Sequence, residues 1–165
     1  MTGGAASAPE AAPHDAIVSP EAREMLAVPA RDLRLVPLSR LTRALEASWD
    51  SRTAYLGAAS PGNAALGQCY PTARVVQWFF PELEIVRGEV DTGSSVECHF
   101  WNIGRDSGIL AHVDLSWAQF PAASVVRSFE VLDRTALDDS QPTIARCRLL
   151  LDRVLVRLAA EQESA

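Results

Sequence analysis

The sequence predicts a single α+β domain, and three features support this class. Helical patterns of apolar residues occupy 38–49 and 70–80, short strand-like segments fill 83–132, and an amphipathic helical pattern covers 140–161. The strand-like segments are grouped together and do not alternate with helices. This order predicts two N-terminal helices packed on a small antiparallel sheet, followed by a C-terminal helix.

Length and composition narrow the class of protein. The chain has 165 residues, 48% hydrophobic and 22% charged, which suits one soluble globular domain. Its net charge of −6 argues against a nucleic-acid or anionic-membrane partner. No apolar run reaches the roughly 18 residues that a membrane span needs, and the first residues lack a signal-peptide pattern. We therefore expect a cytoplasmic protein with reduced cysteines.

The N-terminal elements follow from composition and periodicity. Residues 1–28 are rich in Ala, Pro and Gly and are expected to form a mobile tail, which leaves 29–165 as the folded domain. Apolar residues recur at helical spacing through 38–49, which predicts a helix. Residues 51–67 contain clustered Ser, Pro, Gly and Asn, which predicts a loop.

The C-terminal half predicts a sheet and a long helix. Three strands are expected at 83–90, 95–104 and 108–116, with a fourth strand or an irregular segment at 123–132. The final helix has one apolar face, and its arginines are expected to form a solvated face. The apolar face consists of Ile144, Cys147, Leu151, Val154, Leu155 and Leu158.

A cysteine lies at the predicted start of the second helix. That helix should begin near Tyr70, because Pro71 suits a first turn, and should end at Pro81. Cys69 then lies at the N-cap or in the first turn, where free N–H groups and the helix dipole favour a thiolate. The same N–H groups can hold an oxyanion. Cys69 is therefore a candidate nucleophile, with a small buried core residue as the alternative.

A base for this nucleophile is predicted on the hairpin around "RDSG". If Arg105 faces Gly108 across the turn, antiparallel pairing sets His99 opposite Asp114. Directly opposed side chains have Cβ atoms about 4.5–5.5 Å apart, close enough for an imidazole–carboxylate hydrogen bond. The sequence thus predicts Cys69, His99 and Asp114 as nucleophile, base and orienting carboxylate.

Other roles for the hairpin residues stay open. His112 lies on the same face and can replace His99 as the base, although its predicted partner is Trp101. His99, His112 and Asp114 can also form a two-histidine, one-carboxylate iron site, an interpretation that leaves Cys69 without a role.

Several residues near the predicted site have two possible roles. Trp101 follows on the face of His99 and either shields the pair from water or belongs to the core. Trp117 and Gln119 either border the pocket or pack the turn. Cys98 and Cys147 are expected to be inert core residues.

Three motifs, "NAALGQCYPTARVVQWFF", "HFWN" and "VDLSWAQFP", resemble the YunG-like family of small bacterial proteins. That family is similar in pattern to transglutaminase-like and papain-like cysteine enzymes. The resemblance implies a papain-like fold and the order nucleophile, base and carboxylate on Cys69, His99 and Asp114. By the same resemblance Asn63, six positions before the cysteine, completes the oxyanion hole, with Gln68 as the competing residue.

These observations favour an enzyme that uses a covalent thioester. We expect a cysteine-dependent hydrolase or acyltransferase that acts on an amide or ester of a small molecule or peptide, without a cofactor. Tyr70, Trp101 and Trp117 are expected to help bind the substrate. The alternative from another class is a non-catalytic binding module on the same fold; the oligomeric state is not predicted.

Overall fold

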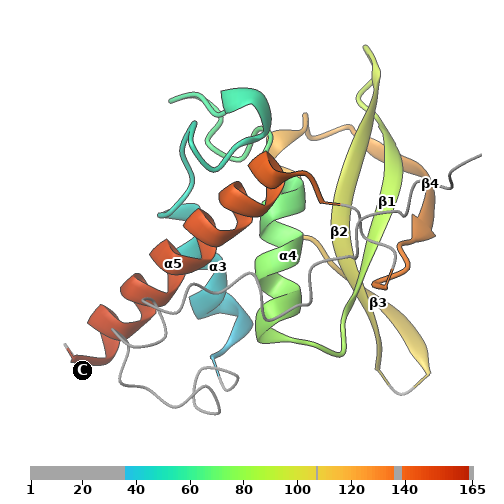
Figure 1. Cartoon of the computed structure of the whole chain (residues 1–165). Helices are drawn as coiled ribbons and strands as arrows, with labels where there is room; N and C mark the ends of the chain where they lie inside the picture. Colours follow the sequence, from blue (N-terminus) through green and yellow to red (C-terminus); the bar gives the residue numbers. More distant parts are fainter. Residues whose placement is uncertain (1–35, 107, 136–138, 164–165) are drawn as a thin grey trace, which may run out of the picture.

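The computed structural model describes residues 36–106, 108–135 and 139–163, and its described part is an α+β domain (Figure 1). The tail expected at 1–28 lies outside the described residues. None of the described helices is long and apolar enough to cross a bilayer. The elements are helices α3 (Leu38–Glu46), α4 (Cys69–Phe79) and α5 (Gln141–Glu163), strands β1 (Glu84–Asp91), β2 (Val96–Asp106), β3 (Ile109–Val113) and β4 (Val125–Val131), and the short 3₁₀ turns η2 (Tyr55–Gly57) and η3 (Trp117–Gln119).

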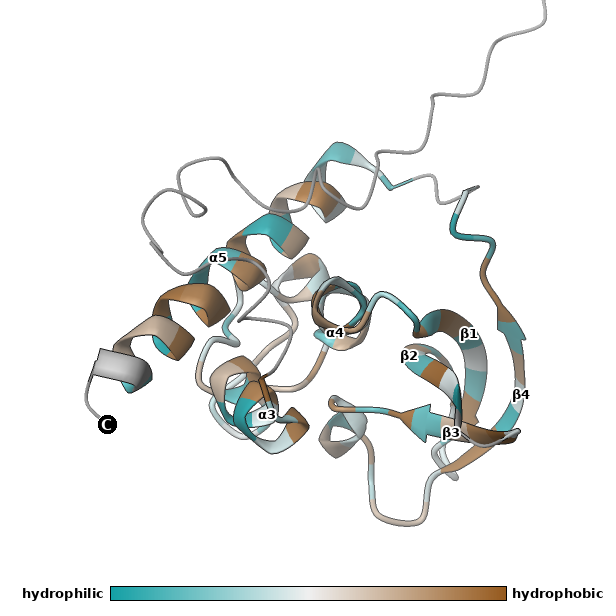
Figure 2. Ribbon diagram, turned by 90° about the horizontal axis from the view of Figure 1, so that it is seen from below, coloured by the Kyte–Doolittle hydropathy of each residue, from teal (hydrophilic) through white to brown (hydrophobic). Residues whose placement is uncertain are grey.

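Helix α4 is the central element of the domain. It lies between the sheet on one side and α3 and α5 on the other (Figure 2). The sheet is antiparallel throughout, with the strand order β3-β2-β1-β4. The segment 123–132, which the sequence left as strand or irregular, therefore forms the edge strand β4. The N-terminal end of α4 carries Cys69 toward β2.

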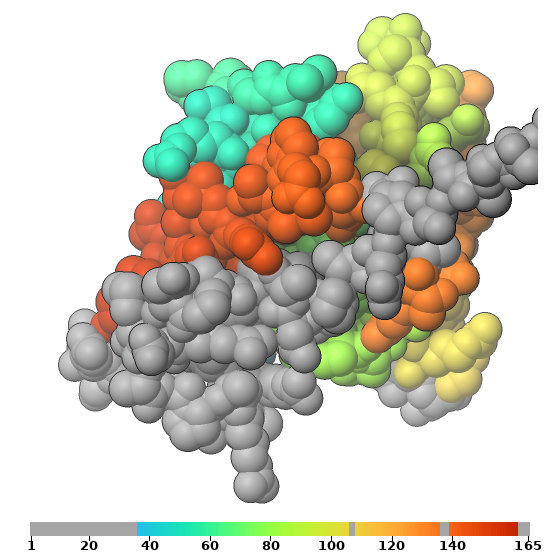
Figure 3. Space-filling model, viewed as in Figure 1, coloured from blue at the N-terminus to red at the C-terminus, as the bar shows by residue number. Residues whose placement is uncertain are grey.

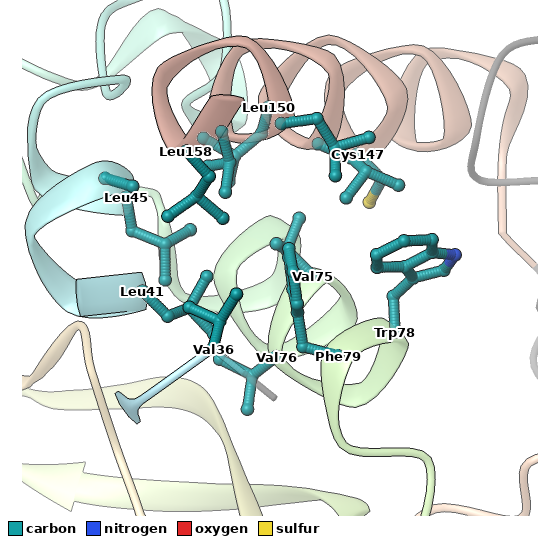
Figure 4. Packing of buried hydrophobic residues seen from close by; sticks show 14 residues of the cluster. Val36, Leu41, Leu45, Val75, Val76, Trp78, Phe79, Cys147, Leu150 and Leu158 are labelled. Atoms are coloured by element: carbon teal, nitrogen blue, oxygen red, sulfur yellow. The ribbon is translucent and has the colours of Figure 1, made fainter. Parts of the chain in front are cut away.

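The main core lies among the three helices (Figure 4). The apolar face predicted for α5 is confirmed for five of its six members, because only Ile144 is half-buried. Leu150 joins the same face and is completely buried. The fully packed members of α5 are Cys147, Leu150, Leu151, Val154, Leu155 and Leu158.

The prediction of a solvated arginine face on α5 is wrong for Arg146 and Arg153, which are half-buried, whereas Arg157 is exposed as expected. Arg153 pairs with Asp50 at 2.9 Å and donates to the Ser48 carbonyl oxygen at 2.9 Å. Arg157 donates to the Ser48 hydroxyl at 3.1 Å. Because Ser48 is only 2% exposed, these bonds fasten the chain after α3 to α5.

The hairpin between β2 and β3 has a register two residues away from the predicted one. Arg105 pairs with Leu110, Ile103 with His112 and Asp106 with Ile109, so the turn lies between Asp106 and Ile109. Gly108 has φ +85°, a conformation that glycine adopts without strain. Because side chains alternate with a period of two, this shift keeps every residue on its predicted face. His99 and Asp114 therefore still share a face, as diagonal neighbours.

A glycine in β1 makes room for the aromatic residue beside His99. A Cβ on Gly88 would lie 2.5 Å from Cη2 of Trp101 and 2.6 Å from the Ser128 carbonyl oxygen. We expect Gly88→Ala to lower the free energy of unfolding by about 1–3 kcal/mol, the usual cost of overpacking. Urea unfolding measures this loss. Gly62→Ala is the control, because a Cβ there meets nothing within 4 Å, and an equal loss in both variants would contradict the steric reason.

Candidate active site

Cys69 is the first residue of α4 and is half-buried. Burial raises the pKa of its thiol to about 11, and hydrogen bonds from the backbone N–H groups of Phe100 and Tyr70 oppose this shift only in part. The hydrogen bond from the Phe100 backbone N–H places the Cys69 sulfur beside β2, one residue after His99. At neutral pH the site therefore holds a thiol, so a nucleophilic role needs a base.

His99 is completely buried, and both of its ring nitrogens have partners. Nε2 lies 2.6 Å from Oδ2 of Asp114, and Nδ1 lies 3.1 Å from Nε2 of Gln119. Because a carboxylate only accepts hydrogen bonds, Nε2 carries the hydrogen and Nδ1 is an acceptor for the Gln119 amide. The predicted pairing of His99 with Asp114 is observed, and it leaves Nδ1 as the basic nitrogen.

The Asp114 carboxylate is oriented by its own loop. Its Oδ1 accepts hydrogen bonds from the Ser116 backbone N–H at 3.0 Å and from the Ser116 hydroxyl at 3.2 Å. Oδ2 is thereby directed at His99. A carboxylate held in this way fixes the tautomer of the imidazole and stabilises an imidazolium.

Aromatic rings enclose the imidazole. Trp101 stacks on it with ring centroids 5.5 Å apart, and Trp117 and Phe120 meet it edge-on at 5.9 and 4.8 Å. Trp101 is only 3% exposed, so it is a core residue, and its ring also shields His99 from water. Trp101 therefore has both of the roles considered from the sequence.

The second histidine of the hairpin has a different partner. The indole N–H of Trp101 donates to Nδ1 of His112 at 2.9 Å. This contact matches the predicted partner of His112. Within the described ranges, no three His, Cys, Asp or Glu side chains are grouped closely enough to hold a metal ion.

The two amides considered for an oxyanion hole are used elsewhere. Asn63 donates from Nδ2 to the backbone oxygen of Gln119 at 2.9 Å, which anchors η3. Gln68 is fully buried and donates from Nε2 to the Asp50 backbone oxygen at 2.9 Å. Gln119, by contrast, directs its side-chain amide at His99 and lines the cleft that contains Cys69. The sequence offered Gln119 only as a residue bordering the pocket or packing the turn, and it does both.

The cleft at Cys69 has a volume of about 770 Å³. Its walls come from the η2 loop and the first turns of α4 and α5, together with β1, β2 and Gln119. Tyr70 forms part of the wall, and its ring meets that of Phe100 edge-on, with the ring centroids 4.9 Å apart. Its hydroxyl donates to Asp139 at 2.5 Å, and burial together with this acceptor raises the Tyr70 pKa. Arg74, 3.2 Å from Asp139, completes a buried polar group behind the cleft.

The expectation that Cys98 is a core residue is wrong. Cys98 is exposed, lines the same cleft, and forms a hydrogen bond with the Arg87 side chain. Cys147, by contrast, is 1% exposed, as expected for a core residue, and burial raises the pKa of its thiol to about 12.

The comparisons with known proteins give a family. A family model described as YunG protein matches residues 37–159, a range that includes Cys69, His99, Asp114 and Gln119. No curated protein matches the chain, and no solved structure matches it.

Proposed function

This chain belongs to the YunG protein family, and we propose that it is a cysteine-dependent hydrolase or acyltransferase acting on an amide or ester through a thioester. The observation that carries the proposal is the bond between His99 and Asp114, which leaves Nδ1 as a base on β2, the strand whose Phe100 N–H contacts Cys69. The cysteine at the start of α4, the histidine on β2 and the aspartate directly after β3 also support grouping this domain with transglutaminase-like and papain-like enzymes.

In the first half of the reaction, Nδ1 of His99 takes the Cys69 proton as the sulfur bonds to the carbonyl carbon. The carbonyl π electrons move to oxygen, and the oxyanion is held by N–H groups at the start of α4. When the carbonyl reforms, the bond to the leaving amine or alcohol breaks, and the His99 imidazolium protonates that leaving group. Asp114 stabilises the imidazolium throughout this half.

In the second half, His99 removes a proton from water or from an acceptor amine, which attacks the thioester. The carbon–sulfur bond then breaks and the proton returns to the Cys69 sulfur. Water gives hydrolysis and an amine gives acyl transfer.

The side chain of Gln119 has to leave Nδ1 before the thiol can transfer its proton there. Its amide lines the cleft, so a rotation about its side-chain bonds can turn the N–H group from Nδ1 toward a developing oxyanion. The bond from Asn63 keeps the Gln119 backbone in place during this change. We propose this donor in place of Asn63 and Gln68.

Trapping of an acyl adduct tests the function. In a Cys98→Ser background, which removes the exposed thiol, an activated ester is expected to acylate Cys69 at neutral pH. His99→Ala in the same background should slow this acylation about 10²–10⁴-fold, the usual contribution of a general base. Peptide mass spectrometry over time measures both rates.

The binding-module alternative makes a different prediction for the same measurement. Without a working base, Cys69 reacts only as its thiolate, so its labelling rate would climb as the pH rises toward the thiol pKa of about 11. His99→Ala would then leave the neutral-pH rate unchanged. That result would contradict the proposed enzyme.

A further inference from the structure

The cleft extends from Cys69 to an arginine on α5. Arg146 lines the same cleft as Cys69 and is half-buried, with its guanidinium carbon 5.6 Å from the centre of the Tyr55 ring. The aromatic ring forms one wall for the cation. Figure 1 shows why the two residues share a cleft: α4 and α5 begin at the same end of the domain.

Within the described part of the chain, Arg146 uses little of its hydrogen-bonding capacity. One terminal nitrogen donates to the Thr143 hydroxyl at 2.9 Å, and the buried Nε has no hydrogen-bond partner. Among the residues that the structure describes, no carboxylate forms an ion pair with Arg146. A guanidinium offers five N–H donors in a planar fork that matches a carboxylate.

The other charged groups of the cleft do not supply this missing acceptor. Asp139 is held by Arg74 and Tyr70, and Glu97 is on the exposed part of β2, where it accepts from Ser95 at 3.0 Å. The N-terminal ends of α4 and α5 both add positive potential at the cleft. Figure 3 shows the beginning of α5 in orange beside the teal segment around η2 and the yellow-green hairpin of β1 and β2, all on one face.

We propose that Arg146 binds a carboxylate of the substrate, so that the enzyme prefers acyl groups with an anionic terminus. The proposal rests on the proposed function, because it names the substrate class for the same cleft. The acyl carbonyl would lie at Cys69, and the distal carboxylate would meet the guanidinium fork against Tyr55. Arg146 is then a specificity-determining residue and takes no part in bond making.

Matched acyl probes test the preference. Nitrophenyl esters of adipate, pimelate and suberate, whose chains are too long for ready closure to a cyclic anhydride, are compared in the Cys98→Ser background, each as the free acid and as the terminal methyl ester. For at least one chain length, the free acid should acylate Cys69 about tenfold faster than its methyl ester, as expected for one charge-assisted pair. Arg146→Gln should abolish this ratio, whereas Arg146→Lys should keep part of it.

The control is Arg148→Gln, which removes the same charge from the same helix at an exposed position outside the cleft. Equal acid and ester rates at every chain length, or a ratio that Arg148→Gln lowers as much as Arg146→Gln does, would overturn the carboxylate site and leave the thioester proposal standing.

A binding measurement separates this proposal from the chemistry. In Cys69→Ala, which cannot be acylated, titration calorimetry with glutarate and adipate should show binding that Arg146→Gln weakens about tenfold. If no probe acylates Cys69 but dicarboxylates bind through Arg146, the thioester function fails and anion recognition stands. Absence of binding to both dicarboxylates overturns the carboxylate site.

Discussion

Asp114→Asn is expected to slow acylation of Cys69 about 10⁴-fold at neutral pH while the domain stays folded, the loss known for the same change in a serine-protease triad. The reason lies in the hydrogen bond between His99 Nε2 and Asp114 Oδ2. An asparagine that keeps Oδ1 toward Ser116 presents an NH₂ group to Nε2, so the imidazole must move its hydrogen to Nδ1. Nδ1 then cannot accept the thiol proton.

The fold should survive because the substitution changes no volume. Oδ1 of the asparagine still accepts the Ser116 backbone N–H and hydroxyl. Gln119 can turn its amide so that its oxygen accepts the new Nδ1 hydrogen. Circular dichroism and urea unfolding, measured beside the acylation rate, separate a lost tautomer from a lost fold.

His112→Gln is the matched control for this prediction. His112 shares the face of His99, but its Nδ1 accepts from the Trp101 indole, and a glutamine oxygen can take over that role. Acylation should therefore change by less than about tenfold, since no reacting group is lost. If His112→Gln abolished acylation while Asp114→Asn did not, His112 would be the base.

The sequence predicted the faces of the hairpin better than its register. Placing Asp106 and Ser107 at the tip put the pairing two residues off, yet His99 and Asp114 still meet. This follows from the period of two, since only an odd shift exchanges the two faces of a strand. Pro71 likewise placed the start of α4 to within one residue, and Pro81 placed its end to within two.

Local sequence patterns could not predict contacts between segments that are far apart in the chain. The exposure of Cys98 depends on how the first turns of α4 and α5 lie relative to β2, which no local pattern encodes. The hydrogen bonds of Asn63 and Gln119 depend on a loop 56 residues away folding back over the sheet. Asn63 is an amide residue at the position that the family resemblance predicts. In the folded domain, however, its side chain hydrogen-bonds to the backbone of η3.

Gln119, whose side-chain amide donates to Nδ1 of His99 in the resting site, is expected to be the oxyanion donor. Gln119→Met keeps a side chain of similar length and removes the N–H donor. Acylation by an activated ester should fall about 10²–10³-fold, the usual cost of losing one oxyanion donor. Alkylation of Cys69 by iodoacetamide forms no oxyanion, so its rate should stay equal or rise, because Nδ1 is freed.

The ratio of the two rates decides the role of Gln119. An oxyanion donor lowers acylation alone, whereas a residue that only positions the imidazole lowers acylation and alkylation together. Gln141→Met, an exposed glutamine at the start of α5, controls for the change of residue type and should alter neither rate. Asn63→Ala should lower acylation less than Gln119→Met, because it frees the Gln119 backbone but keeps the amide. An Asn63→Ala loss larger than that of Gln119→Met would return the oxyanion role to Asn63.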